Sequence, residues 1–401
     1  MKIAIMGYGT VGSGVYEVLV TNAAGIATRA GEAITVERIL DLREFPDHPE
    51  AHKFTKNVDD IINDNGIGLV VETMGGTEPA FTFACRAMKS GKSYVTSNKE
   101  LVAAKGPELM ALAEENGVSF LFEASVGGGI PIIMPLKECL AGNEISEIMG
   151  ILNGTTNYIL TQMFSCGASF ADALSEAQKK GYAEANPDAD VLGYDTCRKI
   201  AILTSLACGK HVDFSRIPTE GITGIDEIDV AFAESLRSSV KLVGYSSVKD
   251  GKAYCRVAPM VIPHDHPLYS VEDVFNAILV TGNAIGDCMF YGRGAGKLPT
   301  ASAVVSDVIA ATTGKISIPP TWKRTDEDVF ADVSSAASRR MIRVSSDAAE
   351  DVKALFTCIS SATTPKAPNE IAFTIDAVSE ADFAEKAAKL GDKLIKSIYL
   401  A

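Results

Sequence analysis

The sequence predicts an α/β protein that contains a Rossmann-type, doubly wound parallel sheet, an α+β domain with a mixed sheet, and a small C-terminal βα domain. Three observations lead to this prediction. A glycine-rich turn follows the first strand, strand-like and helical patterns alternate up to about residue 130, and the pattern changes after three consecutive glycines. With 401 residues, two or three domains are expected, because single hydrophobic cores stop growing well below this length.

The composition argues against several classes of protein. The apolar share of 47% is ordinary for a globular chain, and the net charge of -14 argues against a nucleic-acid or anionic-membrane binder. The eight cysteines form no C-x-x-C pair and no zinc-like cluster with histidine, which is typical of reduced thiols in the cytosol. No apolar run approaches the roughly 18 residues that span a bilayer. We therefore expect a soluble, cytoplasmic protein with no nucleic-acid or membrane partner.

The first segment of the chain carries a nucleotide-binding pattern. The strand "KIAIM" is followed by "GYGTVGSG", in which Gly7, Gly9 and Gly12 match G-x-G-x-x-G. The first glycine permits a tight turn, the second lets a pyrophosphate approach the backbone, and the third lets the helix pack closely on the strand. Because the helix amides would point at the phosphates, a bound dinucleotide is expected to contact Gly7, Gly9, Thr10, Val11 and Gly12.

The second strand, within "ITVERILDL", ends at Asp41, where a carboxylate would accept a hydrogen bond from a ribose hydroxyl. Asp41 follows Gly12 by 29 positions, more than the roughly 20 that are usual, and the segment "TNAAGIATRAGEA" is expected to hold the excess as a loop. Arg43 would instead neutralise a 2′-phosphate. The choice between NAD and NADP is therefore open, and Asp41 could equally be a plain strand-end residue.

The later strands of this domain, "GLVVET", "SYVTS" and "SFLFEAS", alternate with helical patterns at 78–90 and 107–116. In such sheets the ligand binds beyond the carboxyl ends of the strands. The residues that follow two of these strands and should rim the nicotinamide pocket are Thr73, Gly75, Ser97, Asn98 and Lys99. Lys99 has a second interpretation, as a surface lysine at the start of a helix.

After "EASVGGGIPIIMPL" the pattern changes. "EISEIMGILNGTTNYIL" predicts a strand, a tight turn at Asn153-Gly154 and a helix from about Thr156, with further helices at 170–181 and 193–209. "KAYCRVAPMVI", "VFNAILVTG" and "DCMFYG" predict strands of a mixed sheet. "GRGAGKLPTASAVVSDVIAAT" supplies a glycine turn, in which Gly294 is expected to contact the cofactor, and a helix that returns to the first domain. The expected domains are 1–130 with a return segment 295–320, 131–294, and 323–401.

The segment "GYAEANPDADVLGYDTCRKIAIL", residues 181–203, gathers carboxylates ahead of one lysine. Asp195 and Lys199 are four apart on a predicted helix, and on a surface such a pair would contribute little. The residues after Lys199 are mostly apolar, so this lysine is expected to be buried and to need charged partners or a lowered pKa. Glu184, Asp188 and Asp190 would grip the ammonium group of a small amino acid. This combination suits an amino-acid aldehyde and a proton exchange at its oxygen.

Together these segments resemble the homoserine dehydrogenase family, nearly continuously over residues 3 to 320. The matching segments are "GYGTVGSG", "VVETMGG", "TSNKELVA", "EASVGGGIPII", "GILNGTTNYIL", "GYAEANPDADVLGYDTCRKIAIL" and "GRGAGKLPTASAVVSD". The resemblance implies reversible, nicotinamide-dependent interconversion of aspartate 4-semialdehyde and homoserine, on the route from aspartate to threonine, methionine and isoleucine. Many members carry an arginine near the end of the second strand, where this chain has "ILDLRE", so strong NADP preference is not implied.

The resemblance also implies a role for individual residues. Lys199 resembles the catalytic lysine and Lys99 the second lysine beside the nicotinamide, and either would be close enough to the substrate oxygen to deliver the proton. The implied substrate-binding residues are Glu184, Asp190, Asp195, Gly181 and Tyr182. The residues that resemble the family's sodium site, mostly through backbone carbonyls, are Glu123, Val126, Gly128 and Ile130. The family's second domain carries its dimer interface, so a homodimer or homotetramer is expected.

Residues 323–401 read as strand, helix, strand, helix, strand, in the segments "RRMIRV", "AAEDVKALF", "NEIAFTID", "SEADFAEKAAKLG" and "IKSIYLA". This order resembles a small regulatory ACT domain, an amino-acid-sensing module. A clear second strand is missing, because "ISSATTPKAPNE" is polar and interrupted by proline. The tail is therefore either a threonine-sensing domain or a purely structural or oligomerising one.

Two rival functions keep the glycine turn. A dinucleotide-binding regulatory sensor with an ACT-like tail would not need the acidic segment and its buried lysine, and it would usually bring a basic DNA-binding element, which this acidic chain lacks. Another amino-acid dehydrogenase on the same architecture would differ in substrate. NAD(P)H formation that depends on homoserine separates all three.

Overall fold

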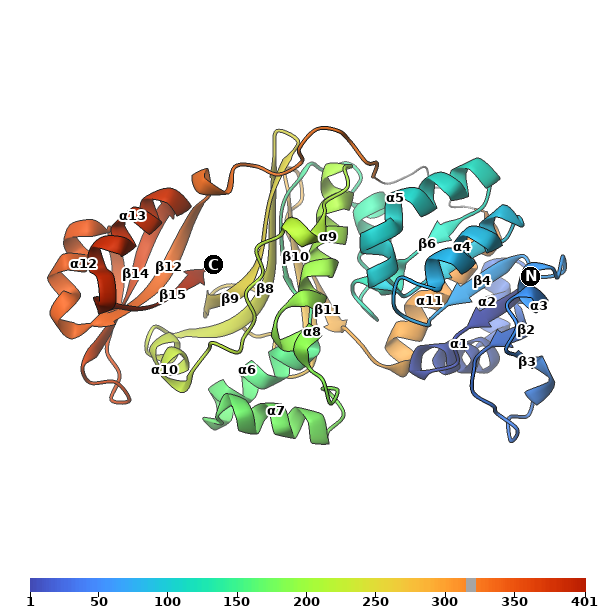
Figure 1. The fold of residues 1–401 in the computed structure, drawn as a ribbon, viewed down its shortest axis with the longest axis horizontal. Helices are drawn as coiled ribbons and strands as arrows, with labels where there is room; N and C mark the ends of the chain where they lie inside the picture. The colour runs from blue at the N-terminus through green and yellow to red at the C-terminus, as the bar shows by residue number, and fades with distance from the viewer. Residues whose placement is uncertain (315–321) are drawn as a thin grey trace. The chain divides into compact units, whose positions relative to one another are not determined.

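The structure, a computed structural model, describes residues 1–314 and 322–401 (Figure 1), so positions 315–320 of the predicted return segment lie outside the described residues. The chain divides into two compact units. Unit 1 comprises Met1–Glu144, Ala201–Ser215 and Gly292–Glu327, and unit 2 comprises Ile145–Ile200, Arg216–Tyr291 and Asp328–Ala401. Most of the predicted C-terminal domain thus belongs to unit 2, and the predicted three-domain division stays a prediction.

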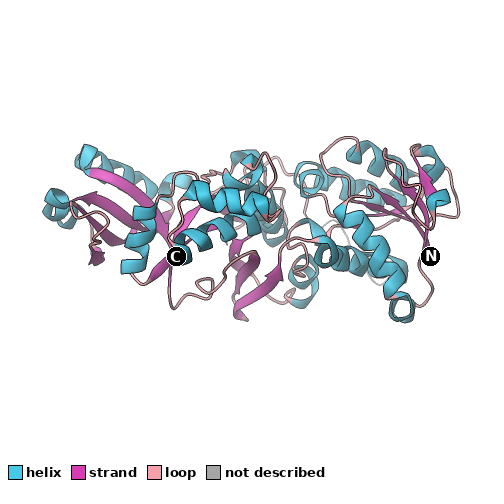
Figure 2. Ribbon diagram, turned by 90° about the horizontal axis from the view of Figure 1, so that it is seen from below, coloured by secondary structure: helices cyan, strands magenta, loops and turns pink. Residues whose placement is uncertain are grey.

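Unit 1 is built on a six-stranded parallel sheet in the order β3-β2-β1-β4-β5-β6, which confirms the predicted doubly wound sheet. Its strands are β1 (Lys2–Met6), β2 (Thr35–Leu40), β3 (Phe54–Thr55), β4 (Leu69–Glu72), β5 (Ser93–Thr96) and β6 (Phe120–Leu121). Its helices are α1 (Thr10–Thr21), α2 (Ala23–Ala30), α3 (Asp59–Ile62), α4 (Ala80–Lys89), α5 (Lys99–Asn116) and α11 (Lys297–Thr313). Helices flank the sheet in Figure 2.

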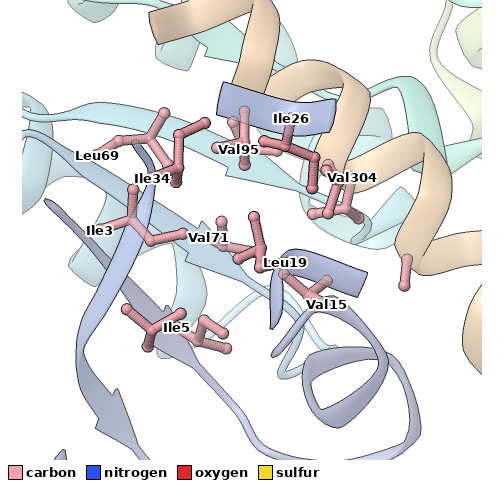
Figure 3. Close-up of a cluster of buried hydrophobic side chains, with 14 of the residues drawn as sticks. Ile3, Ile5, Val15, Leu19, Ile26, Ile34, Leu69, Val71, Val95 and Val304 are labelled. Atoms are coloured by element: carbon pink, nitrogen blue, oxygen red, sulfur yellow. The ribbon is translucent and has the colours of Figure 1, made fainter. Parts of the chain in front are cut away.

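One face of this sheet packs against α1, α2 and α11. Alternate strand residues such as Ile3 and Ile5 point to this face, where they meet Leu19 of α1, Ile26 of α2 and Val304 of α11 (Figure 3). Burial of this cluster fixes α1, and with it the glycine turn that precedes the helix, on the sheet.

In unit 1, one local prediction is wrong and the start of one predicted helix differs. The expected loop "TNAAGIATRAGEA" contains α2, because Ile26 and Ala30 lie on one helix face and are buried, and Gly31 ends the helix in the left-handed region at φ 79°. The helix predicted from residue 107 starts earlier, at Lys99, and carries Pro107 in its interior. Asn98 starts it by accepting a hydrogen bond from the Leu101 amide.

Unit 2 contains a nine-stranded mixed sheet in the order β11-β10-β7-β8-β9-β15-β12-β14-β13, as the sequence predicts for a mixed sheet. Its strands are β7 (Ile145–Ile151), β8 (Ser238–Lys249), β9 (Lys252–Pro263), β10 (Phe275–Gly282), β11 (Gly286–Arg293), β12 (Ala337–Ser345), β13 (Cys358–Ala362), β14 (Glu370–Ser379) and β15 (Leu394–Leu400). Helices assigned to this part of the chain are α6 (Gly154–Cys166), α7 (Phe170–Lys179), α8 (Asp188–Val191), α9 (Tyr194–Cys208), α10 (Glu227–Ser235), α12 (Ala349–Leu355) and α13 (Glu380–Leu390). The pair β15–β9 is parallel, whereas β7–β8 and β8–β9 are antiparallel.

Three features of unit 2 differ from the prediction. The apparent gap in the tail contains β13, a short edge strand that pairs antiparallel with β14, so the tail runs strand, helix, strand, strand, helix, strand. β8, which was not predicted from the sequence, is one of the most buried strands of the sheet. The predicted tight turn at Asn153-Gly154 is the start of α6, with Asn153 as its N-cap.

Among the described residues, no helix combines the length and the hydropathy that crossing a membrane requires.

Candidate functional site

The glycine turn of unit 1 has the geometry of a phosphate cradle. Gly7 has φ +92°, and a Cβ at Gly12 would lie 1.9 Å from the Gly7 carbonyl oxygen, so both positions require glycine. A Cβ at Gly9 would meet nothing within 4 Å, and Gly9 caps α1 without a side-chain hydrogen bond. The first turn of α1, with Thr10 and Val11, therefore offers amides beside open space, which fits the pyrophosphate of a dinucleotide.

Asp41 and Arg43, which lie next to this turn, form an ion pair with two hydrogen bonds. The guanidinium Nε and Nη2 of Arg43 donate to the two carboxylate oxygens of Asp41 at 2.9 and 2.8 Å. The backbone amide of Tyr8, inside the glycine turn, donates to Asp41 Oδ2 at 2.7 Å. The hydrogen bonds from Arg43 lower the pKa of Asp41, so this carboxylate stays charged. Both residues are thus positioned near the turn, and they interact with each other.

The ends of β4 and β5 are tied together by Glu72, which the sequence reading missed. Glu72 is fully buried, accepts from the Thr96 hydroxyl at 2.7 Å, and accepts from the amides of Met74 and Gly75 at 2.6 and 3.3 Å. Burial raises the pKa of Glu72. Its hydrogen bonds fix the backbone at Gly75.

The predicted rim residues surround this carboxylate. The Thr73 hydroxyl donates to the Gly7 carbonyl at 2.8 Å, and the Ser97 amide donates to the Glu72 carbonyl at 3.3 Å. Lys99 is the first residue of α5, directly after the Asn98 cap, and is partly exposed. The structure thus brings Thr73 to the glycine turn and places Lys99 at the end of a neighbouring strand.

The triple-glycine segment packs on the turn that contains Gly294. A Cβ at Gly128, which has φ +56°, would lie 2.1 Å from the buried Gly294 carbonyl oxygen. Glu123 is 3% exposed, and its carboxylate accepts from three consecutive amides, those of Ile132, Ile133 and Met134, at 2.6 to 2.8 Å. Burial raises the pKa of this carboxyl. The other residues of the predicted sodium segment, Val126 and Ile130, are also buried.

In unit 2, Lys199 is buried and pairs with one carboxylate of the acidic segment, that of Asp195. Lys199 and Asp195 are 8% and 5% exposed, and Nζ lies 2.8 Å from Asp195 Oδ2. Nζ also donates to the Leu152 carbonyl at 2.7 Å. These are the polar partners of the Lys199 ammonium among the described residues, so one of its three N–H groups is left for a ligand.

Asn153 joins Asp190 to this pair, and the sequence reading missed it. Its amide nitrogen donates to Asp190 Oδ1 at 2.7 Å and to Asp195 Oδ2 at 2.9 Å, while its oxygen accepts from the Thr156 amide at 2.9 Å. The asparagine directly before a helical pattern was an N-cap signal that would have marked the position, though not these contacts.

The remaining predicted substrate residues lie on the loop before α8. Gly181 has φ +74°, Tyr182 is 43% exposed, and its carbonyl accepts from the Thr155 hydroxyl at 2.6 Å. Glu184 is exposed, and its carboxylate makes no hydrogen bond or ion pair with the described residues. Its carboxylate can therefore accept a ligand cation, whereas Asp190 and Asp195 are already linked through the Asn153 amide.

Two family models match the chain. The model described as "Homoserine dehydrogenase, NAD binding domain" matches residues 7–123, and the model described as "Homoserine dehydrogenase" matches residues 131–309. The chain belongs to the homoserine dehydrogenase family. It is therefore an oxidoreductase with homoserine dehydrogenase activity, as the sequence motifs predict.

Individual homoserine dehydrogenases support this placement. The enzyme of Synechocystis sp. is 46% identical over 319 residues, which cover 77% of this chain and 72% of the relative. The crystal structure of a homoserine dehydrogenase from Thiobacillus denitrificans has a TM-score of 0.91 at 35% identity and covers 100% of this chain and 98% of its own. A hyperthermophilic archaeal homoserine dehydrogenase, solved in complex with NADPH, has a TM-score of 0.67 at 30% identity and covers 79% of this chain and 99% of its own.

Proposed function

We propose that this homoserine dehydrogenase interconverts L-aspartate 4-semialdehyde and L-homoserine, on the route from aspartate to threonine, methionine and isoleucine, with Lys199 as the acid that serves the reacting oxygen. The observation that carries the proposal is the buried ammonium with two of its three N–H groups bound inside the protein. An ammonium held in this way is already oriented before the substrate oxygen arrives, which is what electrostatic stabilisation of a developing negative charge requires.

Each of these residues has a separate role in the reaction. When bound, a nicotinamide dinucleotide supplies a hydride to the aldehyde carbon or accepts one from the alcohol; the turn with Gly7, Gly9 and Gly12 would hold its pyrophosphate. In the reducing direction, the third N–H of Lys199 donates to the aldehyde oxygen and gives up a proton as negative charge grows there. In the oxidising direction the neutral amine takes the proton back. Asp195 and the Leu152 carbonyl hold the nitrogen in place during both steps.

The substrate's own ammonium group requires carboxylates that remain available. Glu184 fits this role because it is exposed and its carboxylate is unpaired among the described residues. Asp190 would assist from the neighbouring helix, and Gly181 and Tyr182 would line the same side of the pocket. Lys99, at the start of α5, would act as a second cation near the nicotinamide.

The ion pair between Asp41 and Arg43 supports use of both cofactors. A ribose diol would compete with Arg43 for the carboxylate, and a 2′-phosphate would compete with Asp41 for the guanidinium. Either cofactor therefore has to break the ion pair between Asp41 and Arg43, so neither NAD nor NADP is strongly preferred. The NADPH complex of the archaeal relative supports binding of the phosphorylated form.

The segment of Glu123, Val126, Gly128 and Ile130 would bind a structural sodium ion. Its support is the buried, tightly turned backbone at Gly128 and one buried carboxylate. The ion would be held mostly by backbone carbonyls and would take no part in the chemistry. A rise in melting temperature with NaCl that equal KCl does not reproduce is the expected result.

Residues 323–401 would form an ACT-like domain that binds threonine. The support is the order strand, helix, strand, strand, helix, strand and an antiparallel set β15-β12-β14-β13 with its own apolar cluster. Titration with threonine is expected to lower the rate of homoserine oxidation. An unchanged rate would leave the tail with a structural or oligomerising role.

A homodimer or homotetramer would form through unit 2. Its edge strand β11 alternates exposed and partly buried residues, and Met289 and Tyr291 are 41% and 52% exposed. Sedimentation of the protein at several concentrations tests this assignment.

The experiment that tests the proposed function is an absorbance assay of homoserine-dependent NADH and NADPH formation, run in parallel. Turnover with homoserine and with neither serine nor threonine is expected. Equal turnover with serine or threonine would reject the substrate assignment.

A further inference from the structure

Asn153 lies where β7 passes into α6 and binds two carboxylates of the lysine site, those of Asp190 and Asp195. It is 5% exposed, and both hydrogens of its amide are used, one on Asp190 of α8 and one on Asp195 of α9. Its oxygen accepts from the Thr156 amide and thereby caps α6. All polar atoms of this side chain are therefore satisfied in one orientation, which also identifies the nitrogen as the atom that faces the carboxylates.

The neighbouring residue completes the arrangement. The Leu152 carbonyl accepts from Lys199 at 2.7 Å, and Asp195 Oδ2 accepts from both the Lys199 ammonium and the Asn153 amide, at 2.8 and 2.9 Å. Two consecutive residues, Leu152 and Asn153, thus hold the Lys199 nitrogen and the Asp195 carboxylate in place. If either moved, the direction of the third N–H of Lys199 would change.

The charges around Asn153 explain why an amide is needed. Asp190 and Asp195 converge on one nitrogen, and Lys199 is the cation that the structure pairs with Asp195. Two carboxylates that approach each other in a buried site repel unless a donor lies between them. Lys180, directly after α7, instead pairs with Glu176 of that helix at 2.7 Å.

We propose that Asn153 is a positioning residue of the reaction, which holds Asp190 and Asp195 at a fixed separation and so fixes the direction in which Lys199 presents its free N–H. This inference rests on the proposed role of Lys199. Asn153 does not itself need to touch the substrate. Its donors are neutral, so it separates the acids without cancelling the charge that binds the substrate's ammonium.

The test is Asn153→Asp in the full-length protein, which keeps the size of the side chain and the oxygen that caps α6 but replaces the donor by a third acid. At high pH the new carboxyl is charged and repels Asp190 and Asp195, so kcat for homoserine is expected to fall roughly 10- to 100-fold. At lower pH the new carboxyl is protonated and can donate one hydrogen bond. The ratio of wild-type to variant kcat is therefore expected to shrink as the pH falls.

The matched control is Asn157→Asp, on the same helix and 1% exposed, where the amide donates to the carbonyls of Val271, Asp273 and Phe275 and to no carboxylate. It should lower the melting temperature but leave a wild-type pH profile in the folded protein. If Asn153→Asp does not fold, Asn153→Ser carries the test, with kcat at least roughly tenfold lower and the dissociation constant of the cofactor unchanged.

The outcomes separate this inference from the proposed function. A wild-type to Asn153→Asp ratio that does not depend on pH, or a folded Asn153→Ser with normal kcat, overturns the positioning role. Normal turnover of a variant that lacks the Lys199 ammonium overturns the proposed function, whatever Asn153 does.

Discussion

Replacing Lys199 with methionine removes the ammonium and keeps an unbranched side chain of similar length. The Asp195 carboxylate, 5% exposed, then loses its cation and keeps the Asn153 amide. Loss of one partner of a buried ion pair costs about 3–5 kcal/mol of unfolding free energy. The developing charge on the substrate oxygen also loses its proton donor, which lowers kcat by roughly 10³- to 10⁴-fold.

The assay for this prediction must separate the two effects. Thermal unfolding gives the stability loss, cofactor titration counts the folded protein, and NAD(P)H formation from saturating homoserine gives kcat. The matched control is Lys241→Met, which removes another buried lysine of unit 2, 3% exposed, whose Nζ donates to the Val271 carbonyl at 2.6 Å. The control should keep kcat within about twofold of the wild type. Turnover of Lys199→Met within tenfold of the wild type, in folded protein that binds cofactor, would refute the assignment of the acid.

Three further predictions follow from unit 1 and from Lys241. Gly12→Ala puts a Cβ 1.9 Å from a backbone oxygen of the turn and should weaken cofactor binding at least roughly tenfold in a fluorescence titration. The control Gly142→Ala, with open space around the added Cβ, should leave cofactor binding unchanged. Asp41→Asn should raise the ratio of kcat/KM with NADP to kcat/KM with NAD, and Arg43→Ala should lower it, by roughly tenfold each; equal ratios in both variants would contradict the ion-pair argument. Burial lowers the pKa of Lys241 from 10.5 to about 8, so the unfolded state binds more protons between these values and the unfolding free energy rises with pH there. Lys241→Met should remove this contribution in denaturant melts at pH 8 and pH 10, and an unchanged slope would show that Lys241 is solvated.

The parts of the site that the sequence predicted are local in the chain. The glycine turn lies within a few residues, and Asp195 and Lys199 are one helical turn apart, so spacing alone brings each set together. Asn153 was not predictable in this way, because its partners Asp190 and Asp195 are 37 and 42 positions away. Glu72 was missed for a related reason: a carboxylate inside an apolar strand shows its role only when Thr96 of the next strand is placed beside it.

The fold shows the same division. Strands that bury apolar residues on the sheet were predicted, whereas β13 was missed because it is a polar edge strand whose Ile359 is 56% exposed. Helix α2 was missed because its sequence is rich in small residues and its periodicity rests on Ile26 and Ala30. Both elements are stabilised by neighbours that lie elsewhere in the chain, which a local pattern does not reveal.

Strand β15 pairs with β9 on one side, through Tyr399 and Leu400, and with β12 on the other. Proteolytic trimming of this final strand would therefore uncover the edges of two long strands in one cut. Each uncovered edge presents a row of unpaired amides and carbonyls that can recruit a strand from another molecule. Damage to the last few residues should thus be seen first as precipitation, before any change in the chemistry at Lys199.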